Sequence, residues 1–192
     1  LPGKAGSYVS IPHDDILSLT TFSIMAWVNY GLTGSTQRIV IKGSATSNYS
    51  YYLSTRGGEV LSYTGFSTSG QAGWIETFGN TPVADKKWHH VAATYDKKSL
   101  RLYVDGKLES EVASSDKPFV TEDPLAIGAE SDGNYSAVGS IDDVGVFNAG
   151  LSEDDINIIM SKGLGEATGM SSVFPAGKLT TVWGKIKVKT SL

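Results

Sequence analysis

The sequence has 192 residues and a formal net charge of −4, and this size suits a single all-β domain with a sizeable core. No basic patch points to a nucleic acid partner, and no apolar run approaches the roughly 18 residues of a membrane span. Because there is no cysteine, a disulfide framework, thiol chemistry and cysteine-ligated zinc are excluded. The 22 glycines favour many short strands joined by turns.

The chain begins Leu1-Pro2-Gly3-Lys4, without a methionine. We interpret it as a processed or excised segment, and processing would mean export with removal of a signal peptide. An extracellular or cell-surface location is therefore expected.

Short alternating runs predict strands through the first half of the chain. They cover residues 6–12, 22–30, 38–42, 51–54, 59–63 and 74–78. The run at 22–30 is apolar on both faces, which indicates a central strand covered on both sides. Gly57-Gly58 between two of the runs predicts a hairpin.

The stretch from Trp88 to Val112 carries the strongest pattern. Apolar and polar residues alternate on both sides of a polar link, and Asp105-Gly106 supplies a second tight turn. Three consecutive antiparallel strands are predicted here. Trp27 and Trp88 are expected in the core.

Further strands are predicted at 125–128 and 139–147, followed by one short helix at 152–162. Ser152 can cap this helix with Asp155 three residues later, and Gly163 suits the position past its end. We expect one domain over 1–163, a linker over 164–178 and a C-terminal strand over 179–192. That strand would dock on its own sandwich or on a neighbouring subunit.

Three stretches carry a family resemblance. They are Tyr8–Pro12 leading into residues 22–28, the hairpin from Trp88 to Lys107, and Gly139–Val144 leading to Ile156. In order and spacing, roughly residues 1–163 resemble the laminin-G-like, concanavalin-A-like jelly-roll superfamily, in its bacterial or archaeal form. The resemblance implies an all-β sandwich of two antiparallel sheets, one of them gently concave. It does not by itself imply a function.

The resemblance also implies a structural Ca²⁺, which binds carboxylate and carbonyl oxygens. Asp142 is the first candidate ligand, with the Gly3 carbonyl as a second donor. Asp132 and Asn134 form an alternative location. The other interpretation is that Asp142 only hydrogen-bonds a neighbouring loop.

Five aromatic residues lie in or beside polar segments and could form a ligand-binding surface. Sugar rings present apolar CH faces that stack on such side chains, although ordinary packing is the alternative for each. The candidates are Tyr49, Tyr51, Tyr63, Trp74 and Tyr135.

No arrangement of residues predicts catalysis. Glycoside hydrolysis requires a pair of carboxylates, whereas Glu59 and Glu76 are isolated. Glu109 and Glu111 share a face, but on a strand that we expect at an exposed edge. We therefore predict no catalytic residue.

Three functions remain open. The first is a non-catalytic recognition or adhesion module that binds carbohydrate or a protein surface. The second is a self-assembling subunit of an extracellular filament or surface layer, a homopolymer built by strand exchange. Its assembly strand would present Val182, Trp183, Ile186 and Val188. The third is a polysaccharide-degrading enzyme.

Overall fold

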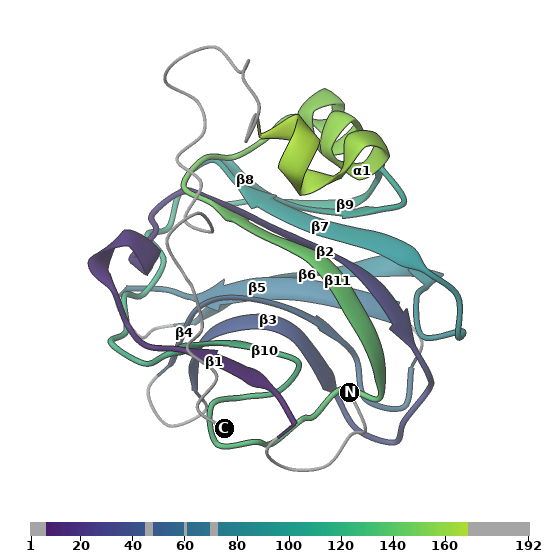
Figure 1. Cartoon of the computed structure of the whole chain (residues 1–192). Coiled ribbons are helices and arrows are strands. Elements are labelled where there is room, and N and C mark those ends of the chain that lie inside the picture. Colours follow the sequence, from purple (N-terminus) through teal and green to yellow (C-terminus); the bar gives the residue numbers. More distant parts are fainter. Residues whose placement is uncertain (1–6, 45–47, 60, 70–72, 169–192) are drawn as a thin grey trace.

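The computed structural model describes residues 7–44, 48–59, 61–69 and 73–168. Within them two antiparallel sheets lie face to face, with helix α1 on the outside of one of them (Figure 1). The six-stranded sheet has the order β1 (Val9–Ile11), β10 (Leu125–Ile127), β3 (Gln37–Ser44), β4 (Asn48–Thr55), β5 (Leu61–Ser67) and β6 (Trp74–Pro82). The five-stranded sheet has the order β11 (Gly139–Phe147), β2 (Phe22–Tyr30), β7 (His89–Tyr95), β8 (Ser99–Val104) and β9 (Lys107–Ala113). The prediction of an all-β, two-sheet jelly-roll sandwich is confirmed.

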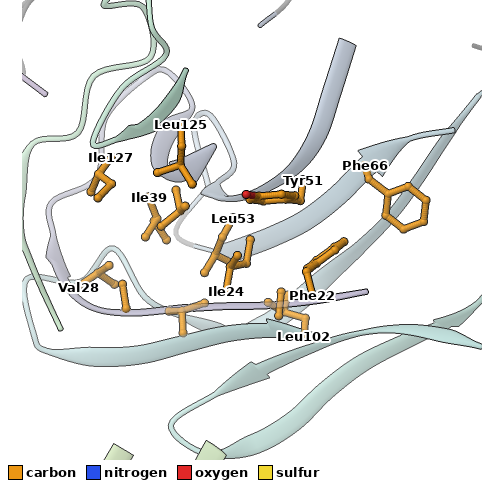
Figure 2. Close-up of a cluster of buried hydrophobic side chains, with 14 of the residues drawn as sticks. Phe22, Ile24, Val28, Ile39, Tyr51, Leu53, Phe66, Leu102, Leu125 and Ile127 are labelled. Carbon is orange, nitrogen blue, oxygen red and sulfur yellow. The ribbon is translucent and has the colours of Figure 1, made fainter. Parts of the chain in front are cut away.

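The core fills the space between the sheets (Figure 2). On β2 the alternate residues Phe22, Ile24 and Val28 point inward, because successive side chains of a strand face opposite sides. The Phe22 ring lies 5.3 Å from the ring of Tyr51 on β4 and 5.8 Å from that of Tyr95 on β7. Both sheets therefore contribute to one aromatic centre.

Helix α1 (Glu153–Ala167) covers part of the outer face of the five-stranded sheet (Figure 1). Its Ile156 and Ile159 pack with Met25, which explains why β2 is apolar on both faces. Ser152 caps the helix as predicted: its hydroxyl accepts from the Asp155 N–H, and the Asp155 carboxylate accepts from the Ser152 N–H at 3.1 Å. No helix of the described residues is long and apolar enough to cross a membrane.

The end of the helix differs from the prediction. Gly163 interrupts it with φ 77°, but the helix resumes and ends at Ala167. The Leu164 N–H, freed by this kink, donates to the Asp143 carboxylate at 3.0 Å. The predicted 164–178 linker thus begins with helical residues. Residues 169–178 lie outside the described residues, as does the predicted strand 179–192 with Val182, Trp183, Ile186 and Val188.

The expectation that Trp27 and Trp88 lie in the core is wrong. Trp88 is 47% exposed, and Trp27 is partly exposed. The cluster beneath α1 includes Met25 but not Trp27, so the helix covers only part of this outer face. Alternation in β2 therefore indicated two apolar faces without indicating how far the second one is covered.

Candidate ligand-binding face

The outer face of the six-stranded sheet carries a row of five aromatic rings. We call it the aromatic row. Neighbouring ring centroids lie 5.3 to 5.6 Å apart in the order Trp74, Tyr49, Tyr52, Tyr63 and Phe78. Tyr63 and Phe78 are stacked with 11° between their planes. These spacings are those of rings in direct contact, so the row is one continuous surface.

A β-bulge in β4 brings two of these rings together. Tyr51 pairs with Lys42 and Tyr49 pairs with Gly43, which leaves Ser50 as the extra residue. Without it, Tyr49 and Tyr52 would face opposite sides of the sheet. The bulge places both on the outer face, where their rings are 5.5 Å apart.

A second bulge, in β3, directs Arg38 outward. Arg38 pairs with Ser54 and Val40 pairs with Leu53, so Ile39 is the extra residue. Ile39 and Val40 therefore both enter the core. Arg38 is left on the outer face, beneath the aromatic row.

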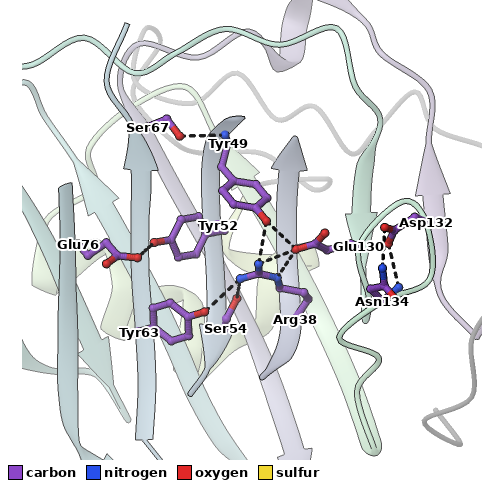
Figure 3. A network of polar contacts seen from close by, with 10 residues as sticks. All are labelled: Arg38, Tyr49, Tyr52, Ser54, Tyr63, Ser67, Glu76, Glu130, Asp132 and Asn134. Atoms are coloured by element: carbon purple, nitrogen blue, oxygen red, sulfur yellow. Dashed lines mark hydrogen bonds and ion pairs between the residues drawn. The ribbon is translucent and has the colours of Figure 1, made fainter. Parts of the chain in front are cut away.

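Arg38 is the centre of a polar network (Figure 3). Its Nη2 donates to Glu130 Oε1 at 2.6 Å and to the Tyr49 hydroxyl at 3.1 Å. Its Nη1 donates to the hydroxyls of Ser54 and Tyr63, both at 3.2 Å. Arg38 and Glu130 are only 5% and 1% exposed, so this ion pair organises the face from below.

The tyrosine hydroxyls complete the network. Tyr49 donates to Glu130 Oε1 at 2.8 Å, and burial together with this hydrogen bond raises the pKa of Tyr49. Tyr52 donates to Glu76 Oε1, and burial followed by Glu76 raises the pKa of Tyr52. A Cβ at Gly65 would come within 2.5 Å of the Tyr52 hydroxyl, so glycine leaves room for this group. Both tyrosines are thus held as neutral, oriented rings.

The two ends of the row are its accessible parts. Trp74 and Phe78 are 49% and 42% exposed, while Tyr49 between them is buried. Both come from β6, where Trp74, Glu76 and Phe78 alternate outward. Tyr135 is also exposed, and its ring lies 5.0 Å from the Arg38 guanidinium. The face offers flat apolar surfaces with carboxylate and hydroxyl groups between them.

Four of the five predicted ligand-binding residues lie on or beside this face: Tyr49, Tyr63, Trp74 and Tyr135. The fifth, Tyr51, does not, because it is fully buried in the core and its hydroxyl donates to the Leu17 carbonyl at 3.1 Å. The bulge at Ser50 explains this placement, because it turns Tyr51 into the core and Tyr52 to the outer face that Tyr49 occupies.

Sequence reasoning missed Tyr52, Phe78, Arg38 and Glu130. Phe78 could have been found, because it lies four residues after Trp74 on an alternating strand. Glu130 could not, because it reaches Arg38 from a loop 92 residues away.

The calcium ligands Asp142, Gly3, Asp132 and Asn134 remain a prediction. Asp132 is satisfied locally, since both its carboxylate oxygens accept from Asn134, at 2.9 and 2.7 Å. The described residues contain no group of three or more His, Asp or Glu side chains that could hold a metal, whereas Ca²⁺ takes six to eight oxygens. Gly3 lies outside the described residues, so a calcium site at Asp142 and Gly3 stays a prediction.

Glu109 and Glu111 both make structural contacts on the edge strand β9. Glu109 accepts from the Thr81 hydroxyl at 2.6 Å and from the Asn80 N–H at 2.6 Å. Glu111 pairs with Arg101 at 2.9 Å. These contacts give both carboxylates a structural role. The expected edge position of β9 is confirmed.

Three solved structures show the same fold at low sequence identity. The binding domain of Paraclostridial Mosquitocidal Protein 1 matches with TM-score 0.68 and 12% identity over 83% of this chain and 42% of that one. A putative carbohydrate binding protein from Bacteroides ovatus matches with TM-score 0.63 and 18% identity over 78% of this chain and 43% of that one. The Ruminococcus gnavus IT-sialidase CBM40 matches with TM-score 0.64 and 15% identity over 80% of this chain and 96% of that one. This chain thus spans about two fifths of the first two proteins.

Comparison with curated proteins finds no match. A family model, described as the concanavalin A-like lectin/glucanases superfamily, matches residues 3–157, which is most of the chain. The match includes every strand of both sheets in the described residues. The chain therefore belongs to the concanavalin A-like lectin/glucanases superfamily.

Proposed function

We propose that this protein is a non-catalytic carbohydrate-binding module and that the outer face of its six-stranded sheet is the binding surface. The observation that carries the proposal is the aromatic row, with Trp74 and Phe78 exposed at its ends. A sugar ring can stack its CH face on such a side chain while its hydroxyls bind polar groups nearby. Binding to glycans outside the cell fits this role, so we include an extracellular location in the proposal.

The rigidity of the face supports this role. Trp74 packs on Tyr49, and Phe78 packs on Tyr63, and both tyrosine hydroxyls bind Arg38. The accessible rings are therefore held in place before any ligand arrives. Preorganisation of this kind lowers the entropy cost of binding.

The polar groups on the face suit hydroxyl recognition. Glu76 lies between Trp74 and Phe78 on the same strand and is exposed. The Tyr63 hydroxyl accepts from Arg38, which leaves its own proton for another acceptor. These groups would orient a sugar that the two outer rings hold.

The acids of the face favour binding over hydrolysis. Glu130 is buried and its charge is neutralised by Arg38, so it is a poor acid or base toward a ligand on the surface. Glycoside hydrolysis requires a pair of carboxylates, and the Glu76 carboxylate already accepts a hydrogen bond from the Tyr52 hydroxyl. The names of the similar structures agree with binding, since they describe a toxin binding domain, a putative carbohydrate binding protein and a CBM40.

The test is binding of the full chain to a glycan array, followed by calorimetry with the best ligand. Trp74→Ala and Phe78→Ala should each weaken binding about tenfold, since removing a stacking ring costs on the order of 1.4 kcal/mol. Leu108→Ala is the control, because Leu108 is an apolar residue of similar exposure on β9 of the opposite sheet. Unchanged affinity in the double variant Trp74→Ala/Phe78→Ala would exclude this face as the binding surface.

A further inference from the structure

A shallow pocket lies on the opposite side of the molecule from the aromatic row, on the outer face of the five-stranded sheet. It is a pocket of about 370 Å³ lined by Trp27, Trp88, Asp142 and Asp143. Trp27 on β2 pairs in register with Asp142 on β11, and Trp88 immediately precedes β7. We call it the tryptophan–aspartate pocket. It shares no residue with the aromatic row.

A β-bulge builds the acidic side of this pocket. In a regular strand, adjacent side chains point to opposite faces, so Asp142 and Asp143 could not both line one cavity. The register between β11 and β2 shifts between Asp142 and Gly145, and Asp143 adopts φ 50°. This left-handed conformation is costly for a residue other than glycine. It brings both aspartates to the pocket.

Asp143 is fixed in this position by the helix. Its Oδ2 accepts from the Leu164 N–H at 3.0 Å, directly after the kink at Gly163. Asp142 accepts from the Asp143 N–H at 2.9 Å and is otherwise exposed. The two carboxylates are thus held beside two indole rings by the backbone and by α1.

No described basic side chain pairs with the two carboxylates of the pocket. His90 lies against Trp27, with ring centroids 5.4 Å apart, but burial lowers the pKa of His90 to about 4 and keeps it neutral at pH 7. His89 points to Asp85 and Asp105 instead, at 3.1 and 2.8 Å. No described cation therefore neutralises the two aspartates.

Two indole rings beside two carboxylates favour an organic cation as the ligand. Indole faces attract cations, and most strongly those that are poorly hydrated, while carboxylates supply the opposite charge. Ca²⁺ fits less well, because indole rings offer it no oxygen and two carboxylates leave most of its coordination sites unfilled. We propose that the tryptophan–aspartate pocket binds an organic ammonium group, whether a quaternary amine or the primary amine of a lysine side chain.

The test is an NMR titration of the full chain, in which the indole N–H signals report each tryptophan separately. Tetramethylammonium chloride probes the quaternary amine, and n-butylammonium chloride probes the lysine-like amine. Sodium chloride and tert-butanol are the controls for ionic strength and for an uncharged molecule of similar size. Saturable shifts of the Trp27 and Trp88 signals with one or both ammonium salts, and not with the controls, are expected.

Two variants test the residues. Asp142→Asn should weaken ammonium binding at least fivefold, and Trp88→Ala should abolish the Trp27 shift, while Trp74→Ala should leave it unchanged. Asp142 is exposed, so its amide variant should fold normally. Equal shifts with tert-butanol, no saturation with either ammonium salt, or undiminished binding by Asp142→Asn would each overturn the proposal. Tighter binding of CaCl₂ that excludes both ammonium salts would do so as well.

Discussion

Replacing Glu130 with Gln should destabilise the protein strongly, although the side chain keeps its shape. Arg38 and Glu130 are almost fully buried, and the guanidinium gives Glu130 Oε1 two hydrogen bonds, at 2.6 and 3.1 Å. Removing one member of a buried ion pair leaves the other charge uncompensated, which costs about 3–5 kcal/mol. The new amide nitrogen would gain nothing, because Glu130 Oε2 is buried without a partner among the described residues.

Equilibrium unfolding in urea measures this loss as a shift in the midpoint at an unchanged slope. The control is the double variant Arg38→Met/Glu130→Leu. It removes both charges and fills the space, and buried ion pairs replaced in this way often cost nothing, so its free energy of unfolding should lie within about 2 kcal/mol of the wild type. A loss below about 1 kcal/mol in Glu130→Gln, or a double variant as unstable as the single one, would refute the argument.

Two further predictions concern the other sheet. Burial lowers the pKa of His90 to about 4 against the weaker attraction of Asp105 and Asp143, so only the unfolded chain takes up a proton as pH falls from about 6.5 to 4. Between pH 7.5 and 5, the free energy of unfolding should therefore fall by about 2 kcal/mol more in the wild type than in His90→Gln. Parallel pH profiles of the two proteins in urea denaturation would show that His90 is not the cause of the pH dependence. Gly106→Ala should destabilise by about 1 kcal/mol more than Gly58→Ala. Both glycines have positive φ, but only at Gly106 would the Cβ meet the Asn157 side chain of α1, which must then move and give up its hydrogen bond to the Gly106 carbonyl. Equal losses in the two urea curves would show that the contact with the helix is not the cause.

Local patterns predicted those parts of the fold that local physics determines. The alternation from Trp88 to Val112 anticipated β7, β8 and β9 with the turn at Asp105-Gly106. The capping pair Ser152 and Asp155 located the start of α1, because its hydrogen bonds join residues three apart. The end of the helix was less predictable, because the Leu164 N–H beyond Gly163 donates to the Asp143 carboxylate, which lies on strand β11.

The candidate binding face depended on information that the local pattern lacks. Alternation alone assigns Tyr49 and Tyr51 to one face. The bulge at Ser50 instead places Tyr49 and Tyr52 on the same face, with their rings in contact. The partner of Arg38 is 92 residues away, and nothing in the sequence near either residue identifies it. Long-range contacts and register shifts of this kind are decided by the packing of the two sheets.

Both candidate sites occur where the two-residue period of a strand is broken. Bulges at Ile39 and Ser50 assemble Arg38 and the aromatic row, and a bulge at Asp143 brings two carboxylates to the tryptophan–aspartate pocket. A regular strand cannot place adjacent side chains on one face, so a cluster of unlike groups on a sheet requires such a break. The cost is visible at Asp143, which holds a left-handed conformation that a core strand would not need. Residues that a strict alternation misplaces, such as Tyr52 and Asp143, are therefore the ones at which substitutions should separate binding from folding.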